Sequence, residues 1–528
     1  MMGEHDDAVR GGEGSGSESK SSTGGRVGRR TFLKQALAAG IVGAGPGWLG
    51  GYGPNLHPRI PAASTMSAGT TEAQALEIAK PFAGKTINFQ VESGLQAAQW
   101  KAIKPRWEKA SGTTLNIVEV PYAEQFQKAL AAIQVGGIDC LYCQYNWLPD
   151  FVGAGVLEPF TPYFDKYLAT SKLKSDLADF SKAAVMANAG WNGQQWGYPI
   201  DGPSFTLFYR TDIFGDPSLR SAFKQKYGYD LAAPTTWEQY AQIGQFLTSK
   251  LAPKVYGAVH QGQAGQAMYW WFQMYNAAKF GNNRFFDDNM NPLVNSDTSV
   301  EVFKRLNSFF DFAPPGSKAW GPVEIWSAFL KGQIAMTITW PPMGRLAGGY
   351  GAASPLMSFV PTSSVTGKFA AAIPPGGNVE EASGYSLAIF SKSANKDLAF
   401  AFLTWATGPA TYLDILSLPF ALLKIVRKSS FTAPESAKLW PGSAQYYAAM
   451  EKELAHLTLE PKLLSSQDYL VAVDQACTAV YAGTDPKQAA DTAAGKWNQL
   501  TNRVGKQKQQ AVYQEFEKEI AALRQLTF

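Results

Sequence analysis

The chain of 528 residues is poor in cysteine, histidine and charge, and each shortage excludes a class of protein. Three cysteines are too few for a disulfide-stapled scaffold. Four histidines, of which His5 and His57 lie in the first seventy residues, leave little for a histidine-built metal site, so we expect no metal and no other cofactor. Charged residues make up 17%, and 47 basic against 43 acidic residues leave a net charge of +4. We therefore expect no nonspecific electrostatic binding of nucleic acid.

The N-terminal region lacks an apolar run that could form a good membrane-spanning helix. Residues 36–57 are uncharged, but they contain seven glycines and two prolines. They follow the letters GRRTFLK at residues 28–34, which resemble a twin-arginine export signal. Residues 1–53 also hold 15 of the 50 glycines, a composition that cannot bury enough surface to fold. We predict an export signal and disordered leader over residues 1–70; the alternative is that the uncleaved signal anchors the protein in a membrane.

Aromatic residues are abundant, by contrast. They make up 13% of the chain, as 15 Trp, 22 Tyr and 31 Phe, and hydrophobic residues in total reach 45%. This composition excludes a mostly disordered chain, and the length is enough for two or three compact domains. The aromatic surplus is the feature that a functional hypothesis must explain.

From residue 85 the pattern alternates between strands and helices. Alternating apolar residues predict strands over 86–91 and 114–120, and a short apolar run predicts a buried parallel strand over 138–143. Helical spacing predicts helices over 95–110 and 124–134, between those strands. This order is typical of a doubly wound α/β lobe. The same reading continues along the chain, with strands over 205–210, 334–340 and 384–390 and helices over 322–330, 395–406, from Asp485, and over 507–525.

Four segments carry a family pattern in the expected order: residues 138–160, 198–212, 332–338 with the letters GQIAMTI, and 384–404 with the letters SANKDLA. Together they resemble the extracellular solute-binding proteins of ABC importers, in the sugar-binding group that includes maltose-binding protein. The resemblance covers about residues 85–505. The chain departs from the family in an insertion over 215–233 and in Arg210, where the family often has Asn.

The resemblance implies an α/β fold of two doubly wound lobes joined by a hinge, as in the type II periplasmic binding proteins. Lobe one would take residues 85–200 and 385–432, and lobe two residues 201–384 and 433–528. A small carbohydrate would bind between the lobes and close them. The protein would be a monomer outside the cytoplasm, exported by the twin-arginine route, that delivers its ligand to the permease subunits of an ABC importer and catalyses no reaction.

A sugar site needs flat rings against the apolar face of the sugar, and amides or carboxylates for its hydroxyl groups. In open α/β lobes such groups lie past the carboxyl ends of strands. Strand ends and adjoining loops therefore give these candidate ligand contacts: Glu92, Tyr145, Asn146, Trp147, Asp201, Trp340 and Tyr385. The family resemblance adds Trp270 and Trp271, next to Tyr269, on an aromatic helix. Each candidate has a structural alternative: core packing for the rings, loop or helix capping for the polar groups.

Trp340 is the first candidate among them, because it ends a predicted strand, precedes the rigid pair Pro341-Pro342 and matches a family ligand loop. Two other functions remain open. A secreted polysaccharide lyase or glycosidase would need two facing carboxylates, or a Tyr or Lys base, and no such spaced set stands out. The second alternative function is a receptor for peptides, polyamines or metal chelates. A polyamine receptor would need acidic groups at strand ends, where Glu92 and Asp201 lie.

Overall fold

The structure is a computed structural model that describes residues 70–167, 176–202, 205–277, 284–351, 354–382 and 384–526. The predicted export signal and leader, up to residue 69, fall outside the described residues. Within the described part of the chain, no helix is both long enough and apolar enough to cross a membrane.

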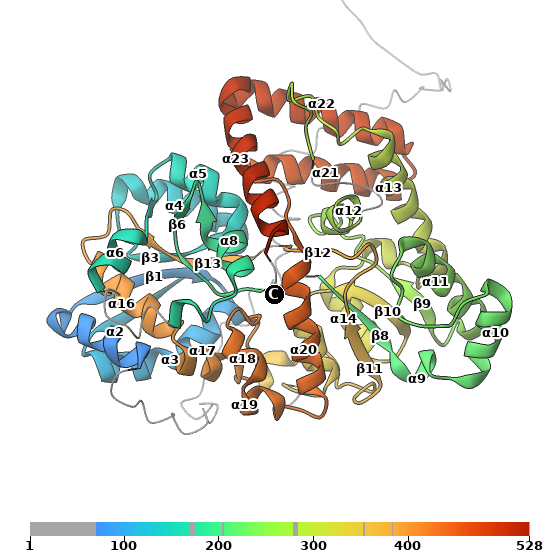
Figure 1. Cartoon of the computed structure of the whole chain (residues 1–528), viewed down its shortest axis with the longest axis horizontal. Helices are drawn as coiled ribbons and strands as arrows, with labels where there is room; N and C mark the ends of the chain where they lie inside the picture. The colour runs from blue at the N-terminus through green and yellow to red at the C-terminus, as the bar shows by residue number, and fades with distance from the viewer. Residues whose placement is uncertain are drawn as a thin grey trace, which may run out of the picture.

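The first of two main sheets lies in the half of the molecule drawn in blue and teal (Figure 1). Its strand order is β2-β1-β3-β13-β4, and β7 also pairs with β13. Strands β2 and β3 run parallel to β1, whereas β13, from much later in the chain, runs antiparallel to β3. The predicted strand–helix order is confirmed, with these bounds: β1 (Thr86–Glu92), α3 (Leu95–Ser111), β2 (Thr114–Val120), α4 (Tyr122–Val135), β3 (Cys140–Gln144), β4 (Leu157–Glu158), β7 (Tyr198–Pro199) and β13 (Tyr385–Phe390).

Aromatic side chains fill the core beside this sheet. Phe89 on β1 has its ring centroid 5.4 Å from Trp100 and 5.3 Å from Phe402, and Trp107 lies 5.3 Å from both Phe402 and Trp405. Phe402 and Trp405 belong to α16 (Lys396–Ala406), which also packs on α2 (Thr71–Ala79). Edge-to-face and tilted ring contacts of this kind add to the burial of apolar area. Much of the aromatic surplus therefore serves packing.

The second sheet has the order β11-β8-β10-β9, with β10 antiparallel to β8 and parallel to β9. Every residue of β10 is buried, because α14 packs on it and α11 packs on both β9 and β10. The apolar and polar alternation of residues 334–340 therefore does not mark a face exposed to solvent. The elements are β8 (Thr206–Arg210), α11 (Trp237–Leu251), β9 (Tyr256–Val259), α14 (Pro322–Leu330), β10 (Ile334–Thr339) and β11 (Phe369–Ala372).

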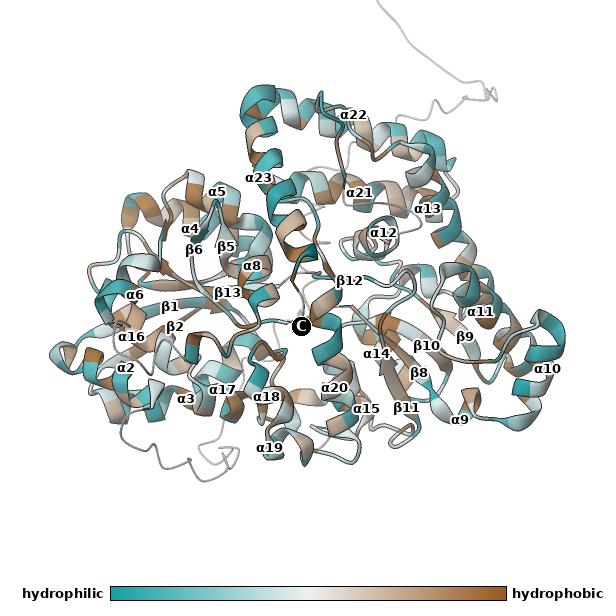
Figure 2. Ribbon diagram, viewed as in Figure 1, coloured by the Kyte–Doolittle hydropathy of each residue, from teal (hydrophilic) through white to brown (hydrophobic). Residues whose placement is uncertain are grey.

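The insertion at residues 215–233 forms a helix of its own, α10 (Pro217–Tyr227). Asp216 caps it by accepting hydrogen bonds from the backbone N–H groups of Ser218 and Leu219. Phe223 anchors the helix, with its ring 5.1 Å from Phe246 on α11. The helix is largely hydrophilic at the edge of the molecule, while brown apolar residues gather on the strands (Figure 2). The insertion thus extends the outer surface beside the second sheet.

The C-terminal helices form a layer with two helices from the middle of the chain (Figure 1). The last helix also contacts α8 (Lys182–Ala189), and α21 contacts the short helix η2 (Tyr145–Trp147), so the layer touches the half built on the first sheet. Both late helices predicted from the sequence are confirmed. The layer consists of α12 (Met268–Tyr275), α13 (Asp297–Ser308), α21 (Ser466–Tyr481), α22 (Pro486–Val504) and α23 (Lys506–Arg524).

Three segments carry the chain from one sheet to the other, and we call them the joining segments. The first, residues 200–202, follows β7 and leads toward β8. The second, residues 373–382, leads from β11 toward β13 and contains β12 (Val379–Glu380), which pairs with β14 (Leu457–Thr458). The third, residues 417–427, follows α17 (Pro409–Leu416).

Arg345 fixes the third joining segment. It lies on α15 (Pro342–Ala347), directly after β10, and its side chain is 5% exposed. Its guanidinium donates hydrogen bonds to the carbonyls of Leu416 and Leu418, both at 2.8 Å, and of Ala421 at 3.1 Å. These carbonyls include the otherwise unpaired end of α17. The planar fork of an arginine suits several acceptors at once.

We expect Arg345→Ala to lower the free energy of unfolding by about 3 kcal/mol, because buried carbonyls would lose their charged donor. Arg345→Lys should recover part of this loss, since lysine keeps the charge without the fork. Chemical denaturation followed by tryptophan fluorescence measures the change. Lys80→Ala is the control, since Lys80 forms an exposed ion pair with Glu77 and its loss should change stability by less than about 0.5 kcal/mol. Equal stability of Arg345→Ala and wild type would contradict this role.

Candidate ligand-binding site

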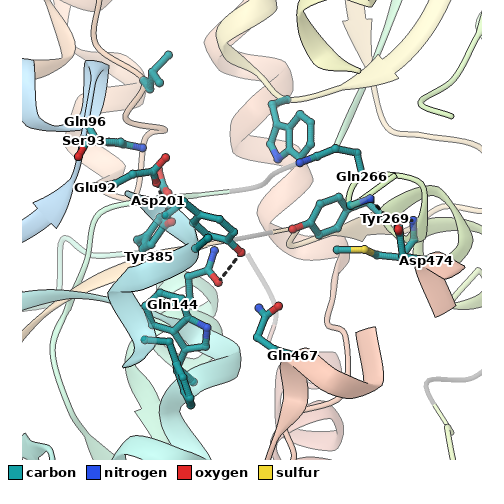
Figure 3. Close-up of a pocket in the computed structure, with 18 of the residues that line it drawn as sticks. Glu92, Ser93, Gln96, Gln144, Asp201, Gln266, Tyr269, Tyr385, Gln467 and Asp474 are labelled. Carbon is teal, nitrogen blue, oxygen red and sulfur yellow. Dashed lines mark hydrogen bonds between the residues drawn. The ribbon is translucent and has the colours of Figure 1, made fainter. Parts of the chain in front are cut away.

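A cavity of about 340 Å³ lies between the two sheets. Its lining comes from the ends of β1, β3 and β13, from the joining segments, from α12 beside the second sheet and from α21 of the C-terminal layer. This volume is in the range of small-molecule sites. Figure 3 shows Glu92, Gln96, Gln144 and Tyr385 on one side of it, and Gln266, Tyr269 and Asp474 on the other.

The first wall is built at one edge of the first sheet. Glu92 ends β1, Gln144 ends β3 and Tyr385 begins β13, and the antiparallel register pairs Tyr385 with Gln144. The Tyr385 hydroxyl donates to Oε2 of Glu92 at 2.9 Å, and the Tyr122 hydroxyl donates to Oε1 of Gln144 at 3.2 Å (Figure 3). The Nε2 group of Gln144, which is fully buried, has no hydrogen-bond partner among the described residues. A buried amide donor of this kind favours an acceptor on a bound ligand.

Burial raises the pKa of Glu92 to about 7. The hydrogen bond from Tyr385 lowers this pKa, and the charge of Asp201 raises it. The carboxyl group of Glu92 is thus poised near neutral pH at the wall of a cavity. A carboxyl placed in this way accepts a hydrogen bond from a ligand hydroxyl more strongly when it is ionised.

The joining segments contribute the next part of the lining. Asp201 comes from the first segment and Lys424 from the third, and both line the cavity. Asp201 Oδ2 lies 3.9 Å from Nζ of Lys424, and both side chains are buried. Burial raises the pKa of Asp201, and the nearby charge of Lys424 lowers it. The residues that bound the cavity are therefore also residues that connect the two sheets.

The second wall is aromatic. Tyr269 on α12 and Trp340, the residue after β10, line the cavity with their ring centroids 5.5 Å apart. Phe205 meets the Trp340 ring edge-on at 5.2 Å. The indole N–H of Trp340 donates to the carbonyl of Ala382, in the second joining segment, at 3.1 Å. Trp340 thus combines core packing with a place at the cavity.

Helix α21 closes the site from the C-terminal layer. Its carboxylate Asp474 accepts hydrogen bonds from the backbone N–H groups of Gly265 at 2.6 Å, Ala267 at 3.0 Å and Met268 at 3.3 Å. Burial raises the pKa of Asp474 to about 6, against the lowering effect of these bonds. Asp474 therefore holds the start of α12 and so positions Tyr269. Gln467, seven residues earlier on the same helix, also lines the cavity (Figure 3).

Five of the nine candidate residues from the sequence line the cavity: Glu92, Trp147, Asp201, Trp340 and Tyr385. The other four do not: Tyr145, Asn146, Trp270 and Trp271. They are buried in packing instead. The Lys462 ammonium lies over the ring of Tyr145, Trp270 packs against Trp237, and Trp271 stacks on Tyr275 at 4.4 Å. On α12 it is Met268 and Tyr269 that line the cavity, because successive residues of a helix point in different directions.

Sequence reasoning missed several lining residues: Tyr122, Gln144, Gln266, Trp326, Lys424, Gln467 and Asp474. Gln144 had a usable signal, because it is the last residue of β3, one position beyond the predicted strand end. Gln467 and Asp474 had none, because only tertiary packing brings α21 to the cavity. Lys424 belongs to a joining segment without regular structure and carries no periodic signal either.

The chain matches the sequence profile of one family, described as bacterial extracellular solute-binding protein, over residues 91–412. A probable amino-acid ABC transporter periplasmic-binding protein of Sinorhizobium fredii is 23% identical over 84% of this chain and 95% of the relative. A lactose-binding protein of Rhizobium radiobacter is 26% identical over 35% of this chain and 41% of the relative.

Solved structures of solute-binding proteins share the fold at low identity. An ABC transporter solute-binding protein of Agrobacterium radiobacter, in complex with ribitol, matches with a TM-score of 0.63 and 21% identity, over 79% of this chain and 99% of its own. One of Agrobacterium vitis, with bound D-mannitol, matches with a TM-score of 0.62 and 20% identity, over 80% and 99%. The predicted mixed α/β fold of the periplasmic binding proteins is confirmed. Since the profile covers more than half of the chain, this protein belongs to the bacterial extracellular solute-binding proteins, a family that binds solutes and does not catalyse reactions.

Proposed function

We propose that this protein captures a small carbohydrate or polyol in the cavity between its two sheets and delivers it to the permease of an ABC importer. The observation that carries the proposal is the pairing of two unlike walls across one cavity. Carboxyl and amide groups at the strand ends of the first sheet face the ring of Tyr269 (Figure 3), and Trp340 lines the same cavity. Polyhydroxylated ligands need both, because hydroxyl groups require hydrogen-bond partners and the C–H faces pack on rings.

The relatives support this ligand class. Two solved structures with the same fold hold ribitol and mannitol, a third holds maltose, and one sequence relative is named as a lactose-binding protein. The relative from Sinorhizobium fredii is named for amino acids. An amino acid would need a cation for its carboxylate, and Lys424, the one cation in the described lining, lies beside Asp201. The lining therefore favours a neutral ligand.

Closure of two lobes around the ligand is part of the proposal. We assign lobe one to residues 85–200 and 385–432 and lobe two to residues 201–384 and 433–528, and we add α2 to lobe one because it packs on α16. The three joining segments would act as the hinge. The lining residues come from both lobes, so a ligand gains its full set of contacts only when the lobes come together.

Among the residues predicted from the sequence, we assign direct ligand contact to Glu92, Trp147, Asp201, Trp340 and Tyr385. We add Gln144 and Tyr269 from the structure. We assign a supporting role to Tyr145, Asn146, Trp270 and Trp271, which pack behind the lining. Export by the twin-arginine route and action as a monomer outside the cytoplasm complete the proposal. Family membership supports the extracellular location, and the paired arginines of residues 28–34 support the route.

A ligand panel tests the function. We expect the melting temperature of the chain without residues 1–69 to rise with ribitol, mannitol, lactose or maltose and not with free amino acids. A ligand at one hundred times its Kd adds about 2.7 kcal/mol to stability. Differential scanning fluorimetry measures the shift, and product analysis after incubation checks for turnover. Release of reducing or unsaturated sugar ends would favour the rival secreted enzyme.

Tyr269→Ala tests the assignment of the aromatic wall. We expect it to weaken ligand binding by about tenfold to a hundredfold, since a ring against a ligand contributes about 1–3 kcal/mol. Trp271→Phe is the matched control, because Trp271 lies two residues away on the same helix, is buried and does not line the cavity. It should bind as wild type does. Titration calorimetry of both variants measures the difference; a larger loss in Trp271→Phe would reverse the assignment.

A further inference from the structure

Each of the three joining segments contributes one buried charged residue to a single cluster. Asp201 comes from the first segment, Glu381 from the second and Lys424 from the third, with exposed fractions of 3%, 0% and 8%. Asn188 on α8 connects them, because its Nδ2 group donates to the Asp201 carbonyl at 2.6 Å and to Oε1 of Glu381 at 3.2 Å. We call these four residues the joining cluster. Segments far apart in the sequence are thus tied together by charge and hydrogen bonds.

The joining cluster is continuous with the ligand cavity. Asp201 and Lys424 line the cavity themselves, and the charge of Asp201 acts on Glu92 at the cavity wall (Figure 3). Tyr385 is the one side chain among the described residues that hydrogen-bonds to Glu92, and it uses Oε2. The second carboxyl oxygen of Glu92 is therefore the group through which a ligand could act on the cluster.

The cluster and its surroundings contain more acids than bases. Glu380 is fully buried beside Glu381, with hydrogen bonds from Asn276 and Thr458, and adds a fourth carboxyl group to those of Glu92, Asp201 and Glu381. The bases that face these acids are Lys424 and Lys462, and Lys462 is already paired with Glu519 of α23. The neighbouring phenols are those of Tyr122, Tyr142, Tyr385 and Tyr412. Three buried carboxyl groups and the half-buried Glu92 outnumber Lys424 and Lys462, and they cannot all be ionised at neutral pH.

We propose that the joining cluster makes ligand binding proton-linked: the unliganded protein holds a proton among Glu92, Asp201 and Glu381, and binding releases it. This inference rests on the proposed function of the cavity. A ligand hydroxyl that donates to the second oxygen of Glu92 stabilises its carboxylate, because a hydrogen bond to the charged form favours that form. The proton leaves to water, and no covalent bond to the ligand forms or breaks. Affinity then rises with pH through neutrality and falls in acidic surroundings.

The raised pKa values agree with the geometry. Burial raises the pKa of Glu381 to about 8, with a lowering contribution from Lys424 and a raising one from Asp201, and it raises the pKa of Glu92 to about 7. The ordinary value for a glutamate is 4.5. The folded protein therefore binds more protons than the unfolded chain between these values. Stability from this source is present at low pH and is lost as pH rises toward 8.

A ligand-free measurement tests the proton itself. In the full chain, the melting temperature of Glu381→Gln should fall less between pH 5 and pH 8 than that of wild type, because glutamine stays neutral throughout. Glu72→Gln is the control, since Glu72 is also buried but caps α17 through the backbone N–H groups of Ala410 and Thr411, away from the cluster. It should retain the wild-type dependence. Parallel curves for Glu381→Gln and wild type would overturn the proposal.

A ligand titration tests the linkage. Titration calorimetry of the full chain with mannitol and maltose, in phosphate and in Tris at pH 7, should give different apparent heats that report proton release. The Kd should fall about tenfold from pH 5.5 to pH 7.5. Glu92→Gln should remove both effects, and Glu72→Gln should keep them. If a sugar binds with equal heats in both buffers and with a constant Kd, the proton linkage is overturned and the proposed function stands. If neither sugar binds, the proposed function fails for these ligands. The melting curves of the ligand-free protein then still decide whether the joining cluster holds a proton.

Discussion

The arrangement of the two sheets depends on charges buried where the chain passes between them. Removing Asp201, Glu381 and Lys424 from water is unfavourable, and the attraction between Asp201 and Lys424 and the hydrogen bond from Asn188 to Glu381 offset part of this cost. Separation of the first joining segment from the third would remove the ion pair between Asp201 and Lys424. Arg345 adds a second tie, from α15 to the third segment. The cavity keeps its shape because its boundary is made from the same residues.

The aromatic residues divide into two groups under this constraint. Beside the first sheet, Trp107 meets Phe402 edge-on and Trp405 at a tilt, and these rings fill the core. At the cavity, Tyr269 and Trp340 contact each other in the same manner, but one side of each borders open space. The physical difference is that these two rings also line a cavity. Aromatic content alone therefore says little about ligand binding, whereas the position of a ring after a strand or on a cavity-facing helix says more.

This distinction explains how far the sequence could be read. Strands and helices with a clear apolar period, such as β2 and α14, were predicted with their observed bounds because local spacing determines them. The rule that functional groups lie at the carboxyl ends of strands found Glu92 and Trp340 at the cavity, whereas Tyr385 lies at the start of β13, which runs antiparallel to β3. The rule could not choose between Tyr269 and its neighbours Trp270 and Trp271. Which side of α12 faces the cavity is set by the packing of Trp270 against Trp237 and by the hydrogen bonds that Asp474 accepts at the start of the helix. Gln467 and Asp474 of α21 could not be predicted either, because tertiary packing places this helix at the cavity.

Trp340 connects the cavity with one of the joining segments. Its ring lines the cavity, and its N–H group holds Ala382, the neighbour of Glu381 in the second joining segment. The ring and the segment are thus held together by a direct hydrogen bond. On the opposite wall, Glu92 also lines the cavity and interacts electrostatically with Asp201 of the first joining segment. On both walls, residues that line the cavity are connected to residues of the segments that join the two sheets.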